Sequence, residues 1–212
     1  MAAFAVSLID VQYADPADQL RLDEELLVEG SAVIRFWEAS TECVVLGRSG
    51  RCERDVYVDA CRAASVPVLR RCSGGGAVLL GPGCLNYTLV LPLTWNSAWR
   101  DVRYSLHWVM NRMCDAMKVA HLRVQGDCDL ALNARKVSGN AQRRTQAAIL
   151  HHGTILYNFD AMRAEQFLRP PHRQPAWRGG RSHRDFLGNV PLRALEIRRR
   201  LVDAWCGEHT SR

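Results

Sequence analysis

The stretch Arg70-Arg71-Cys72-Ser73-Gly74-Gly75-Gly76-Ala77-Val78 lies between two apolar runs, Val66–Leu69 and Val78–Leu80, which we expect to form strands. Glycine has no Cβ and adopts positive φ readily, so three in a row let the backbone turn sharply and present its N–H groups to a ligand. The two arginines offer cationic forks for a phosphate or carboxylate. A tight β-turn with two solvated arginines would explain the same residues. The stretch alone leaves both interpretations open.

Composition narrows the class of protein. The chain has 212 residues, of which 48% are apolar, and we expect one domain over residues 1–212. No stretch approaches the roughly 18 apolar residues of a membrane span, and the N-terminus lacks the features of a secretion signal. The eight cysteines are scattered, without Cys-x-x-Cys pairs or zinc-ligand spacing, so reduced thiols are expected. We therefore expect a cytoplasmic protein without a membrane partner.

The pattern of charges limits the kinds of partner that the chain is expected to bind. The net charge is +6, but the arginines are spread along the chain without aromatic interleaving or a nucleic-acid motif, so we expect no nucleic-acid partner. An acidic protein partner or a phosphorylated ligand fits the charge equally well. Lys118 and Lys136 are the only lysines in a chain that otherwise uses arginine. This usage weakly indicates that a compact ammonium is needed at one of them.

Periodicity predicts interspersed helices and strands. Ala17–Glu29 begins after Pro16, carries leucines among acids and ends at Gly30, and Asp101–Ala120 repeats apolar residues at three- and four-residue intervals. Further helices are expected at Val56–Ala64, 160–168 and Pro191–Cys206. Strands are expected at Ser31–Trp37 and Glu42–Leu46 as a hairpin, and at Leu85–Leu91, Leu122–Gln125, Asp129–Leu132, Lys136–Ser138, Ala147–Leu150 and Ile155–Tyr157. Without a strict βαβ cadence, this order favours an α+β fold with mixed or antiparallel sheets.

Four segments place small polar residues at the ends of these apolar strands: Arg70–Val78, Leu85–Thr88, Asp129 with Arg135–Gln142, and His151–Leu156. Together they resemble the lipoate–protein ligase A and biotin/lipoyl protein ligase family. That family carries an Arg-Arg-x-Ser-Gly-Gly-Gly-Ala-Val loop, a Leu-Asn-Tyr strand, Arg-Lys-x-Ser-Gly-Asn-Ala-Gln and a His-Gly-Thr strand in the same order. The resemblance extends from Asp15 to about Asn189.

The resemblance implies both a fold and a reaction. The fold would be a mixed central sheet with a smaller sheet and flanking helices, similar to biotin ligases and class II aminoacyl-tRNA synthetases. The reaction would be ATP- and Mg²⁺-dependent activation of lipoate or octanoate to an acyl-adenylate, followed by transfer to a lysine of a lipoyl carrier domain or an H protein-like acceptor. Such chemistry needs an apolar slot, fixed donors for phosphate and a positive group where charge develops.

The resemblance also implies roles for single residues. Lys136 would be the catalytic residue, because its ammonium would bridge the acyl carboxylate and the α-phosphate. Substrate-binding residues would be Trp37, Arg48, Arg71, Ser73, Gly74, Gly75, Gly76, His152, Gly153 and Thr154. Nucleotide-binding residues would be Arg71, Ala77, Asn86, Lys136, Ser138, Gly139 and Asn140. For His152, a core histidine bonded to the backbone is an equal alternative.

Asp127 and Asp129 are the candidate metal ligands. They alternate along a predicted strand, so they would share one face and could hold Mg²⁺. A solvated strand edge would explain Asp127 equally well, whereas Asp129 occupies the Asp-Leu position of the family. The magnesium assignment therefore concerns Asp129 first.

Departures from the family pattern leave other functions open. Leu79-Leu80 replaces an aromatic residue and a histidine, and the chain ends where many lipoate ligases continue into an accessory domain, so this protein would either act alone or use a separate accessory chain. An octanoyltransferase would need a cysteine thioester; Cys72, Cys84 and Cys128 are available but not in the contexts that such enzymes use. A lipoyl-binding subunit that is inactive alone is a third reading. A biotin ligase is disfavoured, because its Gly-Arg-Gly-type loop is absent.

Overall fold

The computed structural model describes residues 5–207, which form two β-sheets and the helices around them. The larger sheet has seven strands in the order β1-β2-β6-β10-β9-β8-β7, and the smaller has three in the order β4-β3-β5. The strands are β1 (Ser7–Ile9), β2 (Val33–Trp37), β3 (Cys43–Leu46), β4 (Val68–Arg70), β5 (Val78–Leu80), β6 (Cys84–Pro92), β7 (Arg123–Gln125), β8 (Asp129–Leu132), β9 (Arg135–Arg144) and β10 (Ala148–Leu156). Within these strands, β1–β2 and β3–β4 pair in parallel and the other pairs are antiparallel. The predicted α+β class with mixed sheets is confirmed.

The helix ends follow from capping residues that the sequence already shows. The helices are α1 (Pro16–Glu29), α2 (Cys52–Asp55), α3 (Val58–Ala63), α4 (Val102–Met117), α5 (Ala161–Phe167), α6 (His183–Phe186) and α7 (Ala194–Cys206). Asp15 caps α1 by accepting a hydrogen bond from the Ala17 amide at 2.8 Å, and Gly30 ends the helix with φ +73°. Asp101 caps α4 in the same way through the Tyr104 amide at 2.7 Å.

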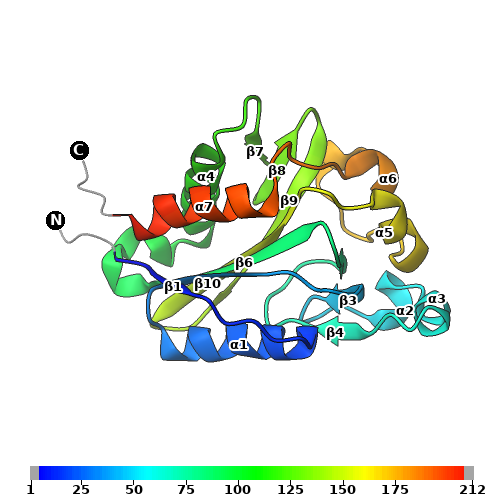
Figure 1. The fold of residues 1–212 in the computed structure, drawn as a ribbon, viewed down its shortest axis with the longest axis horizontal. Coiled ribbons are helices and arrows are strands. Elements are labelled where there is room, and N and C mark those ends of the chain that lie inside the picture. The colour runs from blue at the N-terminus through cyan, green and yellow to red at the C-terminus, as the bar shows by residue number, and fades with distance from the viewer. Residues whose placement is uncertain (1–4, 208–212) are drawn as a thin grey trace.

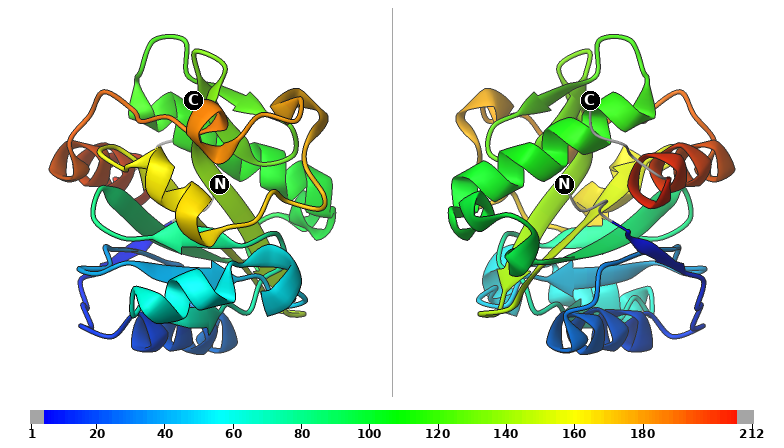
Figure 2. Two further views of the ribbon diagram at one scale, coloured as in Figure 1. Left: turned by 90° about the vertical axis from the view of Figure 1, so that its right-hand side faces the viewer. Right: turned by 90° about the vertical axis from the view of Figure 1, so that its left-hand side faces the viewer.

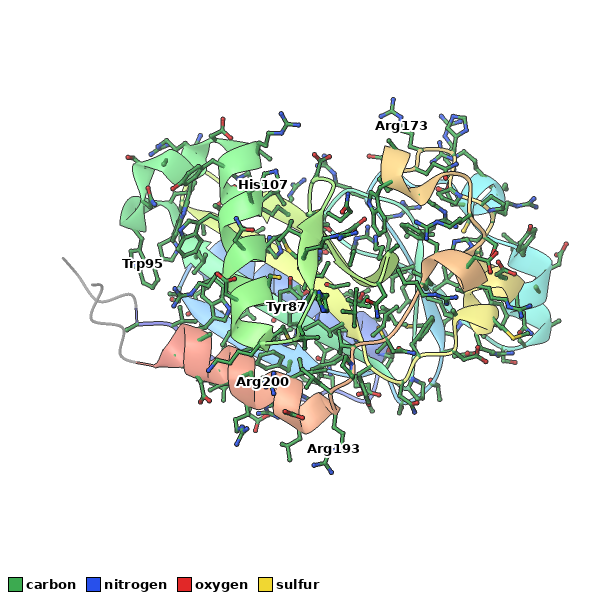
Figure 3. All side chains as sticks on the ribbon, turned by 90° about the horizontal axis from the view of Figure 1, so that it is seen from above. Tyr87, Trp95, His107, Arg173, Arg193 and Arg200 are labelled. Carbon is green, nitrogen blue, oxygen red and sulfur yellow. The ribbon has the colours of Figure 1, made fainter. Side chains whose placement is uncertain are left out.

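Helices cover both faces of the seven-stranded sheet. One face lies against α1, and the other lies against α4 and α7 (Figure 1, Figure 2). Three methionines of α4 are fully buried: Met110, Met113 and Met117. Seen from above in Figure 3, Arg193 lies on the outer side of the molecule at the start of α7, whereas Tyr87 of β6 lies inside the molecule. The two faces of the sheet are thus separate environments, and strand register decides which of them a side chain enters.

The small sheet lies beside one end of the large one, next to α2 and α3 (Figure 1). The predicted hairpin of Ser31–Trp37 with Glu42–Leu46 is wrong, because β2 pairs with β1 and β6 in the large sheet while β3 joins β4 and β5 in the small one. The same alternation of apolar residues suits either sheet, so the pattern could not distinguish them. The predicted helix Val56–Ala64 is also corrected, since α2 precedes it and α3 covers only part of it.

Two segments that the sequence predicts as loops between strands lie within continuous strands. The expected strand Lys136–Ser138 continues to Arg144 as β9, and the segments Ala147–Leu150 and Ile155–Tyr157 belong to the continuous strand β10. Their glycines and polar residues are typical of loops, but β10 is hydrogen-bonded on both sides, to β6 and to β9. Within residues 5–207, we find no helix long and apolar enough to cross a membrane.

Candidate functional site

The glycine loop, residues Gly74–Gly76, is an exposed turn between strands β4 and β5 of the small sheet. Gly75 has φ +95°, a conformation that other residues rarely adopt, and a Cβ on Gly47 would collide with the Gly75 carbonyl. In the described part of the chain, no group accepts a hydrogen bond from the amides of these three glycines. These three amides are therefore free to donate hydrogen bonds to a ligand.

The two arginines before the loop donate hydrogen bonds to backbone carbonyls, Arg71 within the loop and Arg70 in the segment after β3. Arg71 donates to the carbonyls of Gly74 at 2.6 Å and Gly76 at 3.0 Å, and burial lowers its pKa to about 10. Arg70 donates through one nitrogen to the carbonyls of Gly47, Arg48 and Gly50. Arg71 was expected to contact a ligand. In the structure its hydrogen bonds also hold the bent shape of the loop.

Strand register collects several predicted site residues on one face of the large sheet. Trp37 of β2 lies opposite Asn86 of β6, Asn86 lies opposite Thr154 of β10, and Thr154 lies opposite Gly139 of β9. Directly opposite residues in antiparallel strands project to the same face. These residues form one row across four strands. The amide of Asn86 donates to the Trp37 carbonyl at 3.3 Å, so this side chain stabilises the row as well as lining it.

A second row lies beside the first on the same face. Arg35 of β2 is opposite Thr88 of β6, which is opposite His152 of β10. His152 Nε2 lies 2.6 Å from Ser73 Oγ, so this histidine connects the sheet to the glycine loop. Its Nδ1 lies 2.8 Å from a carboxylate oxygen of Asp23 in α1. His152 is thus a buried histidine whose two ring nitrogens contact side chains, whereas the core alternative had expected backbone partners.

Lys136 lies next to the first row. Its ammonium is 2.7 Å from the carboxylate of Asp129, and the two side chains are 25% and 11% exposed. A Cβ on Gly139 would lie 2.8 Å from Cε and 2.9 Å from Nζ of Lys136. The absent side chain of Gly139 thus makes the space that the ammonium occupies, on the face that carries Thr154. The other lysine of the sequence, Lys118, caps the C-terminal end of α4.

Three predicted residues face the opposite side of the sheet. Gly153 pairs with Asn140, and the side chain of Asn140 accepts a hydrogen bond from the Tyr87 hydroxyl at 2.5 Å and donates to the Cys128 carbonyl at 2.6 Å. The hydroxyl of Ser138 also bonds to Asn140, at 3.3 Å. A Cβ on Gly153 would collide with the Asn140 side chain. Register therefore directs these side chains into the core and away from the glycine loop.

Residues 15–191 match the model of the lipoyl protein ligase A/B catalytic domain. The chain belongs to this family. The match covers the glycine loop, both rows and Lys136, so the resemblance inferred from the four motifs is confirmed.

Curated relatives of this lipoyl ligase family domain are longer than it is. The chain is 31% identical over 161 residues to a candidate lipoate-protein ligase A of Aeropyrum pernix, covering 73% of this chain and 59% of that protein. It is 28% identical over 162 residues to a candidate lipoate-protein ligase A of Schizosaccharomyces pombe, covering 76% of this chain and 44% of that one. The chain thus spans about half the length of these relatives.

Solved structures share the fold of this lipoyl ligase family domain. A bi-partite lipoate protein ligase from Thermoplasma acidophilum, studied with its E2 lipoyl domain, superimposes with a TM-score of 0.81 at 20% identity and covers 95% of this chain and 82% of that one. A lipoate-protein ligase A bound with ATP superimposes with a TM-score of 0.79 at 19% identity, covering 95% and 84%. At these identities, the likeness shows the fold.

The predicted metal pair of this lipoyl ligase family domain does not form. Asp127 lies in the turn between β7 and β8 and points to Arg103 at 4.0 Å, whereas Asp129 begins β8 and pairs with Lys136. The turn reverses the chain between the two aspartates, so they share no strand face. Among residues 5–207, no three His, Cys, Asp or Glu side chains gather as a metal site. Asp129 alone remains a candidate ligand.

The cysteines are free but not activated. All eight are free thiols, as expected. Burial raises the pKa of Cys72 and of Cys128 to about 11, and it raises the pKa of the fully buried Cys84 further. A thiol with a raised pKa is a poor nucleophile at neutral pH, because the thiolate is the reactive form.

Sequence reasoning missed a buried polar group behind the site. Asp23, Arg35 and Thr88 are almost fully buried, and Asp23 accepts hydrogen bonds from both of the others. One signal was available, since Asp23 lies three residues after Leu20 and four before Leu27 and so occupies the apolar face of α1. A charged residue on such a face needs a buried partner.

Proposed function

We propose that this chain catalyses ATP-dependent activation of lipoate or octanoate and transfers the acyl group to a lysine of a lipoyl carrier domain. What supports the proposal is the position of Lys136 between the first row and Asp129, within a chain whose family and relatives are described as lipoate ligases. Two structures of the same fold are described with lipoic acid and with ATP bound.

The reaction has two steps that the site residues serve. A carboxylate oxygen of the acid attacks the α-phosphorus of ATP and displaces pyrophosphate; then the carrier amine attacks the acyl carbonyl, loses a proton and displaces AMP. The glycine-loop amides would hold the phosphate or carboxylate oxygens. The ammonium of Lys136 would neutralise charge on those oxygens in both steps. The row containing Trp37, Asn86 and Thr154 would line the slot for the acid.

Mg²⁺ would enter with the nucleotide. Magnesium usually keeps several waters and binds through one or two carboxylates and the substrate phosphates, which suits a single carboxylate at Asp129. It would supply positive charge beside the phosphates. Asp129 would then have to exchange its contact with Lys136 for one with the ion.

The deciding experiment measures pyrophosphate release by the purified chain with ATP, Mg²⁺ and lipoate or octanoate, together with mass spectrometry of a lipoyl-domain acceptor. Pyrophosphate plus a modified acceptor supports the ligase. A modified acceptor formed from octanoyl-carrier protein without ATP would instead indicate the octanoyltransferase, although the raised pKa values of its candidate cysteines oppose it. Variants Cys72→Ser and Cys128→Ser separate the two, because only the transferase would depend on a thiol.

We further propose a separate accessory chain and a cytoplasmic location. What supports the accessory chain is a protein of the same fold from Thermoplasma acidophilum that is described as bi-partite. Binding of lipoate without pyrophosphate release would indicate that the accessory chain is required for adenylation. The location rests on the free cysteines.

A further inference from the structure

Asp23 joins three groups in the sheet behind the glycine loop. One of its oxygens accepts hydrogen bonds from Arg35 Nη1 at 2.9 Å and Thr88 Oγ1 at 2.6 Å. Its other oxygen lies 2.8 Å from His152 Nδ1. Asp23, Arg35 and Thr88 are 2%, 0% and 0% exposed, so the carboxylate is a buried charge with its main partners fixed by register.

The contacts continue from His152 to the loop. An ionised carboxylate only accepts hydrogen bonds, so a neutral His152 donates from Nδ1 to Asp23 and accepts at Nε2 from the hydroxyl of Ser73. Ser73 Oγ also accepts a hydrogen bond from Arg71 Nε at 3.1 Å. The proton position on the imidazole therefore fixes the direction of the Ser73 hydroxyl.

Ser73 is not placed as a nucleophile. The distances from Ser73 to His152 and from His152 to Asp23 resemble those of a Ser-His-Asp triad, in which the carboxylate selects the tautomer. Ser73 is 0% exposed, however, so its hydroxyl is closed to an incoming acyl group. Its carbonyl accepts a hydrogen bond from the Arg48 amide at 2.8 Å, which ties the start of the glycine loop to the segment after β3.

We propose that Asp23 is a positioning residue that fixes the glycine loop through His152 and Ser73. It selects the imidazole tautomer, the imidazole orients the Ser73 hydroxyl, and Ser73 holds the loop against Arg48. The benefit to catalysis rests on the proposed function, in which the loop binds the acid and the phosphate. The effect on the loop does not, since it can be measured without substrate.

The variant Asp23→Asn tests this chain of contacts in the full-length protein. Because Arg35 and Thr88 both donate to one oxygen, the carbonyl of the new amide stays with them and its NH₂ group faces His152 Nδ1. The imidazole proton must then move to Nε2, and the Ser73 hydroxyl loses its acceptor. ¹⁵N spectra of the imidazole should report this change of tautomer. Amide exchange at Arg48 should become about 10- to 100-fold faster, the range for losing one hydrogen bond in a charged network.

Two further variants keep the test decisive. Ser73→Ala removes the far end of the contacts without disturbing Arg35, so it should accelerate exchange at Arg48 even if Asp23→Asn fails to fold. Asp18→Asn, at an exposed acid of the same helix, should change neither exchange nor activity. With ATP, Mg²⁺ and lipoate, Asp23→Asn should lower kcat/KM about 10- to 100-fold. The double variant with Ser73→Ala should be no worse than Ser73→Ala alone, because both changes act through one path.

The outcomes separate the two proposals. An unchanged tautomer in Asp23→Asn, or unchanged Arg48 exchange in Ser73→Ala, overturns the positioning role whether or not the protein is a ligase. Additive losses in kcat/KM overturn it as well, because they would mean that Asp23 and Ser73 act independently. If the exchange and the tautomer change as expected while no acid is activated, the proposed function fails and the positioning of the loop stands.

Discussion

The ammonium of Lys136 lies 2.7 Å from the carboxylate of Asp129, and neither side chain is well exposed. Each group therefore compensates the charge of the other while no substrate is bound. Removing only one partner leaves the second charge poorly solvated, which costs about 1–3 kcal/mol. Because of this pair, a substitution of Lys136 should change both the catalytic rate and the free energy of unfolding, and the two effects can be measured separately.

Lys136→Met should abolish acyl-adenylate formation, with a loss of at least about 100-fold in kcat, the scale for removing a group that stabilises developing charge. It should also lower the free energy of unfolding by about 1–3 kcal/mol, and Asp129→Asn in the same chain should restore part of that loss. Pyrophosphate release and urea denaturation measure the two effects. Lys118→Met is the matched control, because it removes the only other lysine ammonium. Full activity of Lys136→Met would refute the catalytic assignment.

Gly139→Ala should displace the ammonium of Lys136 while leaving the lysine in place. The new methyl would lie 2.8 Å from Cε and 2.9 Å from Nζ, closer than real contacts allow. A shift of about 1 Å in a reacting group can cost about 100-fold in rate, so we expect a loss of up to that size in pyrophosphate release. In the Lys136→Met background, the same substitution should have little further effect. An equal loss in both backgrounds would mean that Gly139 acts elsewhere.

Gly75→Ala and Gly76→Ala should differ in stability. At Gly75, φ is +95° and a Cβ would lie 2.8 Å from Arg71 Nη2, whereas a Cβ on Gly76 meets nothing within 4 Å. We expect Gly75→Ala to lower the free energy of unfolding by about 1 kcal/mol or more and Gly76→Ala to leave it nearly unchanged. Both should weaken lipoate binding, since each adds a methyl beside the exposed amides. Thermal denaturation and calorimetric titration give the two readouts; equal stability of the variants would contradict the strain at Gly75.

His151 should make the fold sensitive to acid. Burial lowers its pKa from 6.5 to about 3, so below pH 6.5 the unfolded chain binds a proton that the folded chain does not. The contribution of His151 to the free energy of unfolding is therefore fully present above pH 6.5. It falls by about 1.4 kcal/mol per pH unit as the pH drops towards 3. His151→Phe retains an aromatic ring beside Tyr87 and should make this slope shallower.

Urea denaturation between pH 7 and pH 4 measures the effect of His151. Some slope should remain in the variant, because burial also lowers the pKa of His183, to about 4. The exposed His121 provides the control, and His121→Asn should leave the slope as it is in the wild type. An unchanged slope in His151→Phe would show that the buried imidazole is not responsible.

The parts of the site that were predicted from sequence are local. The glycine loop and the lysine within Arg135–Gln142 are consecutive residues, and their chemistry can be recognised without knowing what lies opposite them. The helix ends at Gly30 and Asp101 are equally local, because capping involves the next few residues. These features account for the correct α+β class as well.

The parts of the site that were not predicted depend on which strands pair and in which register. Whether Asn140 or Thr154 faces the site is decided by the register of β9 against β10, and a shift of one residue would exchange the two faces. The fully buried Arg35 looks in sequence like any arginine of an exposed strand. The error over the hairpin has the same origin, since β2 and β3 have similar patterns and different sheets. Single-sequence patterns carry no information on such pairings.

The contact between Asp23 and His152 spans 129 positions of the chain. Bringing such distant segments together costs loop-closure entropy that local contacts do not repay, so this contact belongs among the late events of folding. A chain emerging from the ribosome completes the glycine loop long before β10 exists to meet it. The loop therefore lacks its contact with the large sheet until synthesis has passed His152, and binding competence arrives with the completed sheet rather than with the motif itself.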